Sequence, residues 1–190
     1  METVKVIPES DYGILENLVK EYLPGTDDIK SICRNYPAAV VGYYLDSALI
    51  GCAYGFASPW EGEKRFSLDG IAIAHPFNAS GRGGKLLKFF ERCVYDLSHR
   101  CIDLGSAGGY VERFYIKNGY TPIELKVLVE DDGWKEKQQG YAFPVAEIQT
   151  QGEYTKLVLA VNDYAAMDKD EITEYYGGVD SFFVFEKMLP

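Results

Sequence analysis

The chain has 190 residues, of which 47% are hydrophobic, 25% charged and 14% aromatic. This length favours one domain of ordinary size, and the composition is that of a globular protein, which excludes a disordered chain, a collagen-like repeat and a coiled coil. The formal net charge is −10. We therefore expect no nucleic-acid partner, because neutralising phosphates requires a surplus of Lys and Arg, and a cationic or amine partner suits the chain better.

Two further absences in the sequence limit its function. No apolar run approaches the roughly 18 residues that a membrane-spanning helix needs, and the N-terminus has no basic segment followed by an apolar one. We therefore expect a cytoplasmic protein without a membrane partner. The cysteines form no CxxC pair, and only two histidines could join them as ligands. We expect neither a disulfide framework nor a bound metal.

Apolar periodicity predicts alternating strands and helices over the first 74 residues. A helix should begin after a cap at 8–11, carry its apolar side chains on one face and end before Pro24. The other predicted elements are a strand over 4–7, a short helix over 27–36, strands over 38–45 and 48–58 that form a hairpin, and a strand over 66–74.

The pattern changes to helical spacing after the last of these strands. The predicted elements are a helix over 81–97 that begins at a glycine-rich turn, a strand over 101–104, a helix over 110–117 and a strand over 122–129. A polar stretch over 130–152 is interpreted as a loop, and its length makes it a candidate lid or linker. The chain then closes with a β-α-β unit, whose parts are a strand over 156–161, a helix over 168–176 and a strand over 181–189.

The acidic residues are concentrated toward the C-terminus. Residues 121–190 carry 14 acidic and 6 basic side chains, whereas residues 1–120 carry 15 acidic and 13 basic ones. An acidic surface most often serves solubility, and the alternative is that it steers a cationic substrate. We expect a core over 1–130 and an extension over 131–190 that packs on it. Pairing of the extension with a second copy is the alternative, so the protein is expected to be a monomer or a homodimer.

The segment from Ile71 to Leu87 carries the strongest chemical signal in the sequence. A strand that runs through glycines into a helix aims several backbone N–H groups and the positive end of the helix dipole at one point, which suits an anion. Basic side chains add positive charge there, at Arg82, Lys85, Lys88 and Arg92. The spacing is neither GxxxxGK followed by Ser or Thr nor GxGxxG, which disfavours a nucleoside triphosphatase or a Rossmann enzyme. A glycine turn with a solvated basic helix face explains this segment equally well.

A second segment, Tyr110 to Tyr120, predicts a short amphipathic helix with Val111, Phe114 and Tyr115 on one face. Taken alone, Tyr115 is more readily explained as a core aromatic, since aromatics on an apolar face usually pack.

Together the two segments resemble the GNAT superfamily of acyl-CoA-dependent N-acyltransferases, over about residues 1–130. The family's turn motif, Arg or Gln followed by xxGxG or xxGxA, corresponds to NASGRG at 78–83, and its later FYxxxGF corresponds to FYIKNGY at 114–120. Two positions depart from the family. Asn78 replaces the long polar side chain of the turn motif, and Gly108 stands where many members have an Asn that touches the cofactor.

The resemblance implies an α/β (α+β) fold, with a mixed, mostly antiparallel central sheet flanked by helices and a C-terminal β-α-β extension. It also implies acetyl-CoA or another acyl-CoA as co-substrate and no metal. The pyrophosphate would lie at the glycine turn and the pantetheine arm along the backbone of the preceding strand, where the family's sheet splays open. The residues implied for this site are Ser80, Gly81, Arg82, Gly83, Gly84 and Lys85 at the turn, and Ile71, Ala72 and Ile73 on the strand.

The implied reaction is attack of a neutral amine on the thioester. Alkyl amines have a pKa of about 10.4, so a base must remove a proton, and Asp69 and Glu63 are the candidates. A solvated or hydrogen-bonded carboxylate is the plainer explanation of Asp69. The N–H of Ile73 would meet the oxyanion. By resemblance Tyr115 would protonate the leaving thiolate, or only hydrogen-bond it, because a thiol of pKa about 8.5 is a stronger acid than a phenol of pKa about 10.

Three functions stay open at this stage. The first is an N-acetyltransferase acting on a small-molecule or protein amine. The second is a GNAT fold that binds acyl-CoA as a sensor without transferring the acyl group. The third is an interaction module whose acidic extension recruits a basic partner. Fold alone does not decide among them.

Overall fold

A computed structural model describes residues 1–24, 29–57, 64–78, 81–106, 108–138, 141–152 and 154–190. The chain divides into two compact units, Met1–Leu104 together with Met188–Pro190, and Gly105–Lys187. No helix in the described ranges is long and apolar enough to cross a membrane.

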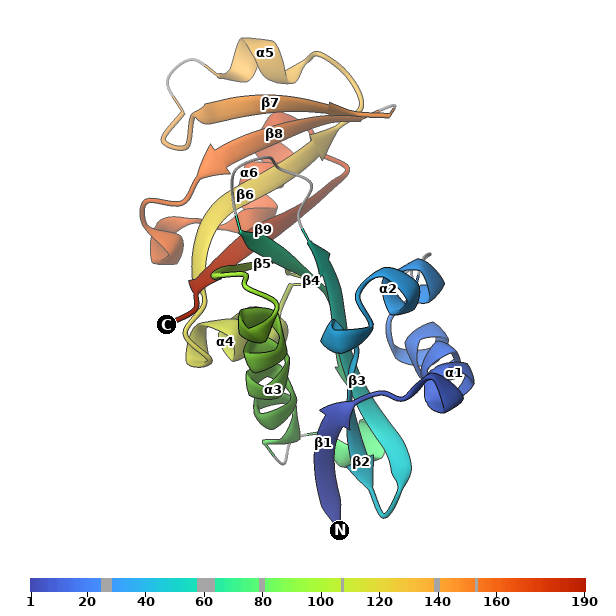
Figure 1. The fold of residues 1–190 in the computed structure, drawn as a ribbon. Helices are drawn as coiled ribbons and strands as arrows, with labels where there is room; N and C mark the ends of the chain where they lie inside the picture. The colour runs from blue at the N-terminus through green and yellow to red at the C-terminus, as the bar shows by residue number, and fades with distance from the viewer. Residues whose placement is uncertain (25–28, 58–63, 79–80, 107, 139–140, 153) are drawn as a thin grey trace. The chain divides into compact units, whose positions relative to one another are not determined.

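The first unit is built on strands in the order β1-β2-β3-β4-β5 (Figure 1). The strands are β1 Glu2–Val6, β2 Val41–Leu45, β3 Ala48–Ala57, β4 Arg65–Ile73 and β5 Cys101–Gly105, whose last residue belongs to the second unit. Neighbouring strands are antiparallel except β4 and β5, which are parallel. The helices are α1 Tyr12–Tyr22, α2 Ile29–Asn35 and α3 Arg82–Asp96, with short 3-10 turns at Glu9–Asp11, Pro37–Ala39 and His75–Phe77.

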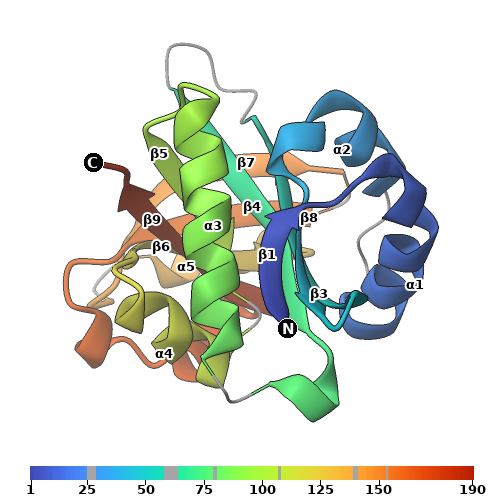
Figure 2. The same cartoon turned by 60° about the horizontal axis from the view of Figure 1, so that its bottom comes forward.

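The helices of this unit cover both faces of its sheet. Figure 2 shows α3 on one side of the strands and α1 with α2 on the other. The helical spacing of apolar residues explains this packing, because α3 buries Leu86, Leu87, Phe90 and Val94 on one face. Phe90 is fully buried, and its ring lies 6.0 Å from that of Phe66 on β4. Truncating such a side chain to Ala costs about 3–5 kcal/mol.

The second unit has a sheet in the order β9-β6-β8-β7, and the printed registers of β6 with β8 and β9 and of β7 with β8 are all antiparallel. The strands are β6 Thr121–Val129, β7 Val145–Gln151, β8 Tyr154–Ala160 and β9 Asp180–Met188, whose last residue belongs to the first unit. The helices are α4 Tyr110–Lys117, α5 Trp134–Lys137 and α6 Lys169–Tyr176, with a 3-10 turn η4 at Tyr164–Ala166. Alternate residues of the strands fill the core, among them Leu125, Val127, Leu157, Leu159, Phe183 and Phe185.

The polar stretch over 130–152, interpreted from the sequence as a loop, contains a helix and a strand, so that interpretation is wrong. Residues 134–137 form α5, and 145–151 form β7, which pairs with β8. β7 stands at the end of the strand order, and its Ile148 is 52% exposed. An edge strand that buries little needs no apolar alternation, because backbone pairing with its neighbour holds it.

The other predicted strands and helices lie within a few residues of their expected bounds and are confirmed. The division into a core over 1–130 and an extension over 131–190 stays a prediction. In the second unit β6 lies between β8 and β9. Residues from both expected parts therefore share one sheet.

Candidate functional site

The start of α3 has the geometry of an anion-binding turn. Gly81 caps the helix with φ +76°, the left-handed region that favours glycine. A Cβ built on Gly81 meets no described residue within 4 Å, so backbone conformation explains the glycine. The first turn of an α-helix presents N–H groups without carbonyl partners in the helix. The Lys85 N–H already donates to the Gly81 carbonyl at 3.2 Å. Ser80 lies outside the described residues.

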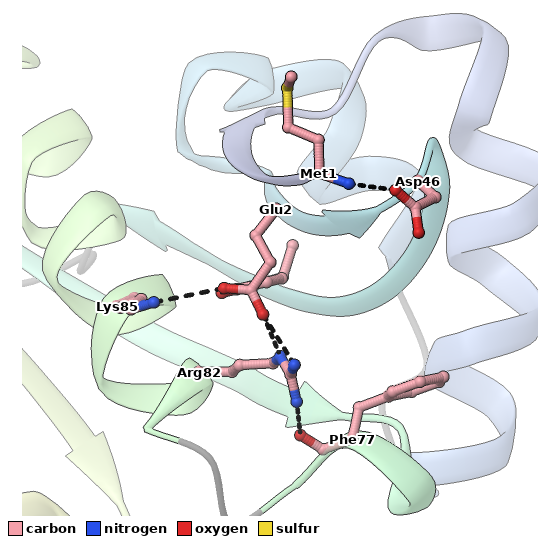
Figure 3. A network of polar contacts seen from close by, with 7 residues as sticks. Met1, Glu2, Asp46, Phe77, Arg82 and Lys85 are labelled. Carbon is pink, nitrogen blue, oxygen red and sulfur yellow. Dashed lines mark hydrogen bonds and ion pairs between the residues drawn. The ribbon is translucent and has the colours of Figure 1, made fainter.

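The basic side chains of this turn are engaged by a carboxylate of β1 (Figure 3). The Nε and Nη2 of Arg82 donate to Glu2 Oε1 at 3.0 and 2.7 Å, and its Nη1 donates to the Phe77 carbonyl at 3.1 Å. Lys85 Nζ and the Tyr43 hydroxyl donate to Glu2 Oε2 at 3.3 and 2.6 Å. The hydrogen bonds from Tyr43 and the two cations lower the pKa of Glu2 to about 2. The carboxylate therefore balances part of the positive charge expected at the turn.

The register of the sheet places this turn at the end of β4. One row of paired residues crosses the sheet from β4 to β1. Its members are Ile73 on β4, Gly51 on β3, Tyr43 on β2 and Val4 on β1. The Tyr43 hydroxyl reaches Glu2, and Glu2 holds the first residue of α3. The glycine turn and the last residues of β4 therefore lie at the same end of the sheet.

β4 separates from β5 before it reaches that end. The two strands pair only where Arg65, Phe66 and Ser67 stand opposite residues 101–103, whereas β4 pairs with β3 from Phe66 to Ile73, with Asp69 unpaired. Within the described part of the chain, the β5-facing edge of Ile71–Ile73 has no strand partner. An open strand edge offers backbone N–H and C=O groups to an extended ligand.

Asp69 occupies a β-bulge in β4. Leu68 stands opposite Gly55 and Gly70 opposite Tyr54, which leaves Asp69 as the extra residue without a partner on β3. Bulges redirect the side chain of the extra residue and recur beside active sites. Asp69 is exposed as a whole, but nearby protein atoms partly desolvate its carboxyl group. This desolvation raises the pKa of Asp69. The other candidate base, Glu63, lies outside the described residues.

A second carboxylate, which the sequence did not single out, lies where β4 and β5 separate. Asp103 stands opposite Ser67 at the last pair of the ladder and accepts a hydrogen bond from its hydroxyl at 2.6 Å. It is half-buried. Asp103 is the one acidic residue in the apolar strand 101–105, and this position could have identified it from the sequence as a candidate functional residue.

Tyr115 belongs to the second unit, on the buried face of α4. It is 5% exposed, and its ring contacts those of Phe114, Tyr120 and Phe185 at 5.4, 5.7 and 5.9 Å. Its hydroxyl has no hydrogen-bond partner among the described residues. Burial raises its pKa above the ordinary phenol value. Tyr115 is thus a core aromatic in its packing, with a hydroxyl that the described protein leaves unused.

Gly108, the second departure from the family motif, lies in the loop before α4. Its φ is +88°, and a Cβ there would lie 3.2 Å from Lys169 Nζ. A side chain at this position would require both a strained backbone and movement of the lysine. In the described residues no group of three or more His, Cys, Asp or Glu side chains is arranged to hold a metal ion.

Comparison with known proteins supports the fold through structure alone. No family model matches the chain, and no curated protein matches it. It is similar to the crystal structure of Ard1 from Thermoplasma volcanium, with a TM-score of 0.60 and 12% identity over 100% of this chain and 98% of that one. It is also similar to a GNAT family acetyltransferase from Elizabethkingia anophelis with acetyl-CoA bound, with a TM-score of 0.57 and 15% identity over 99% and 98% of the two chains. A third is the PaiA N-acetyltransferase from Thermoplasma acidophilum in complex with coenzyme A, with a TM-score of 0.53 and 14% identity over 99% of each chain.

The chain has the GNAT fold. Identities of 12 to 15% establish the fold and no more. They confirm the expected mixed sheet, mostly antiparallel and flanked by helices. Within this GNAT fold, the first unit holds the glycine turn, Asp69 and the open edge of β4, and the second unit holds Tyr115. The roles expected for these residues stay predictions.

Proposed function

We propose that this protein transfers an acetyl group from acetyl-CoA to a primary amine by direct attack. The observation that carries the proposal is the separation of β4 from β5 after Ser67, at a strand that ends beside the glycine turn of α3. One strand edge and one helix N-terminus in the same unit suit an extended ligand with an anionic end. The GNAT fold supports the same conclusion by analogy.

The residues present fit an acyl-CoA in this position. The first-turn amides, including those of Gly83 and Gly84, would hold the pyrophosphate with Ser80 and Gly81, and Ile71–Ile73 would pair with the pantetheine arm. Among the described residues, nothing lies within 4 Å of a Cβ built on Gly81, which is consistent with a ligand at this turn. Glu2 engages the side chains of Arg82 and Lys85. These two residues would therefore bind the pyrophosphate through their backbone N–H groups and through the positive charge that Glu2 does not balance.

Each step of the transfer can be assigned to a residue of the chain. Asp69 would take a proton from the acceptor ammonium, and its raised pKa moves it toward the range of a useful base. Asp103 is a second candidate for this step, since it lies where the strands part. The N–H of Ile73 would stabilise the oxyanion, and Tyr115 would donate a hydrogen bond or a proton to the leaving sulfur.

A sensor that binds acyl-CoA without transferring the acyl group is the alternative. The observation that favours it is the packing of Tyr115, which is 5% exposed and whose hydroxyl has no hydrogen-bond partner among the described residues. The acceptor of the transferase would be a small-molecule or protein amine, with a cationic one favoured by the acidic composition.

Calorimetric titration with acetyl-CoA tests the binding step. Gly81→Ala places a methyl group at the turn and should weaken binding at least tenfold. Gly152→Ala is the matched control, because Gly152 also has positive φ, +61°, and a Cβ built on it likewise meets no described residue within 4 Å. Both variants carry similar backbone strain, so only a contact at the turn separates them.

The outcomes distinguish the two functions. Binding followed by acetylation of any member of an amine panel supports the transferase. Binding without transfer to any amine, and without release of CoA, supports the sensor. A folded protein, free of copurified CoA, that gives no heat with millimolar acetyl-CoA would refute both.

A further inference from the structure

A buried carboxylate lies beside Tyr115 and has no role in the steps above. Glu112 is 8% exposed and is the one buried charged residue in the described part of the chain. Its Oε2 accepts a hydrogen bond from the Tyr164 hydroxyl at 2.6 Å, and its Oε1 accepts one from the Ser106 hydroxyl at 3.2 Å. The Ser106 Oγ in turn accepts from the Gly108 N–H at 2.9 Å. The described residues provide no ion pair for Glu112, so these hydroxyls compensate its desolvation.

These bonds join a loop and a helix that are close in sequence to a turn 52 residues after Glu112. Ser106 belongs to the loop after β5, Glu112 to α4, and Tyr164 to the turn η4 of the expected extension. A short hydrogen bond from a phenol to a carboxylate is among the stronger ones in proteins. This hydrogen bond therefore ties the expected extension to α4.

The same helix face carries Tyr115. The buried residues of α4 are Glu112 and Tyr115, which are three positions apart and thus neighbours on one face. The ring of Tyr164 lies 6.3 Å from that of Phe185, and Phe185 lies 5.9 Å from Tyr115. Tyr164 therefore contacts α4 by a hydrogen bond at Glu112 and shares an aromatic neighbour with Tyr115.

α4 depends on such contacts for its position. It has 8 residues, begins at Tyr110 and has no side-chain hydrogen bond at its N-cap residue, Gly109, and helices this short are marginal without tertiary packing. The Tyr115 hydroxyl has no described partner that would orient it. A misplacement of about 1 Å can cost about a hundredfold in rate, so whatever fixes α4 also fixes the use of Tyr115.

We infer that Tyr164 and Glu112 are positioning residues, which hold α4 and thereby orient the Tyr115 hydroxyl for the role proposed for it. The inference rests on the proposed function. It assigns the segment after residue 130 a part in the reaction: Tyr164 of the turn η4 holds the helix that carries the proton donor.

Tyr164→Phe tests this inference, because it removes the hydroxyl and keeps the ring against Phe183, 5.0 Å away. Tyr176→Phe is the matched control, since Tyr176 is also a buried tyrosine of the second unit and loses one hydrogen bond, to the Phe143 carbonyl at 2.8 Å. The first measurement is hydrogen exchange of the α4 amides. We expect exchange about tenfold faster in Tyr164→Phe and unchanged in Tyr176→Phe, as loss of one bond to a charged acceptor predicts.

The second measurement is a double-mutant cycle on the acetyl-transfer rate. Tyr164→Phe alone should lower kcat about tenfold while the KM for acetyl-CoA stays within about twofold. Added to Tyr115→Phe, it should lower kcat less than about twofold further, because there is no longer a hydroxyl to position. Glu112→Gln keeps the shape of the side chain and serves as a second variant if Tyr164→Phe does not fold.

The results separate this inference from the proposed function. If Tyr115→Phe alone leaves kcat unchanged, the role proposed for Tyr115 fails, and the inference fails with it. If Tyr115→Phe slows the reaction while Tyr164→Phe changes neither kcat nor α4 exchange, the inference alone is overturned. Fully additive losses of kcat would also overturn it, since they indicate general destabilisation. Unchanged α4 exchange in both Tyr164→Phe and Glu112→Gln overturns it whether or not an acceptor amine has been found.

Discussion

Replacing Tyr115 by Phe removes one hydroxyl and leaves the aromatic ring in place. The ring packs against Phe114, Tyr120 and Phe185 with centroid distances from 5.4 to 5.9 Å, and the hydroxyl has no hydrogen-bond partner in the described chain. No described protein hydrogen bond is lost, so the free energy of unfolding should change by less than about 1 kcal/mol. A change in rate would therefore report on chemistry rather than on folding.

The size of the rate loss depends on what the hydroxyl does. A general acid contributes about 10²- to 10⁴-fold. Burial raises the pKa of Tyr115 above the phenol value of 10.0, which makes proton transfer to a thiolate less favourable. We therefore expect a loss toward or below the lower limit of general acid catalysis, but at least about tenfold in kcat, which corresponds to about 1.4 kcal/mol. The raised pKa also keeps the phenol protonated up to at least pH 10, so its ionisation should not reduce kcat below that pH.

Initial rates of CoA release with an amine panel measure this effect, with melting temperature as the check on folding. Tyr175→Phe is the control, because it also removes one tyrosine hydroxyl of the second unit, which donates to the Lys137 carbonyl at 2.8 Å. A Tyr115→Phe variant with the rate of the unaltered protein would refute the proposed role and leave Tyr115 as a packing residue.

Glu2, Asp69 and the segment after residue 150 can each be tested by one variant. The pKa of Glu2 is about 2 in the folded protein against an ordinary 4.5, so its contribution to stability is fully present above pH 4.5 and is lost as the pH falls toward 2. Glu2→Gln should lower the melting temperature at pH 7, and the difference should vanish near pH 2; an equal difference at both pH values would contradict the assignment. Asp69→Asn should lower kcat and abolish the acidic limb of the pH-rate profile, because desolvation raises the pKa of Asp69 above its ordinary value of 3.8; a retained limb would show that Asp69 is not the base. Truncation after residue 150 removes both strands that flank β6 and should give an insoluble protein; a soluble monomer with unchanged acetylation would show that the extension neither completes the core nor shapes the site.

Local features of this protein were determined by the sequence. The left-handed turn at Gly81, the helix that follows it and the hairpin of β2 and β3 each depend on residues close together in the chain. Two local motifs, NASGRG at 78–83 and FYIKNGY at 114–120, carried the resemblance from which the GNAT fold was predicted. Strand β7 was missed because it is held by pairing with β8 and carries little apolar signal of its own.

The tertiary structure alone decided which groups meet at the candidate site. Glu2 engages the Arg82 guanidinium from a position 80 residues earlier in the chain, so the charge at the glycine turn could not be judged from local composition. Tyr164 reaches Glu112 across 52 residues. The types and spacing of residues predict the strand or helix that they form, because the interactions that favour a strand or a helix act between neighbours in sequence. Partners brought together by sheet pairing and helix packing depend on the whole chain, and so a single sequence leaves them open.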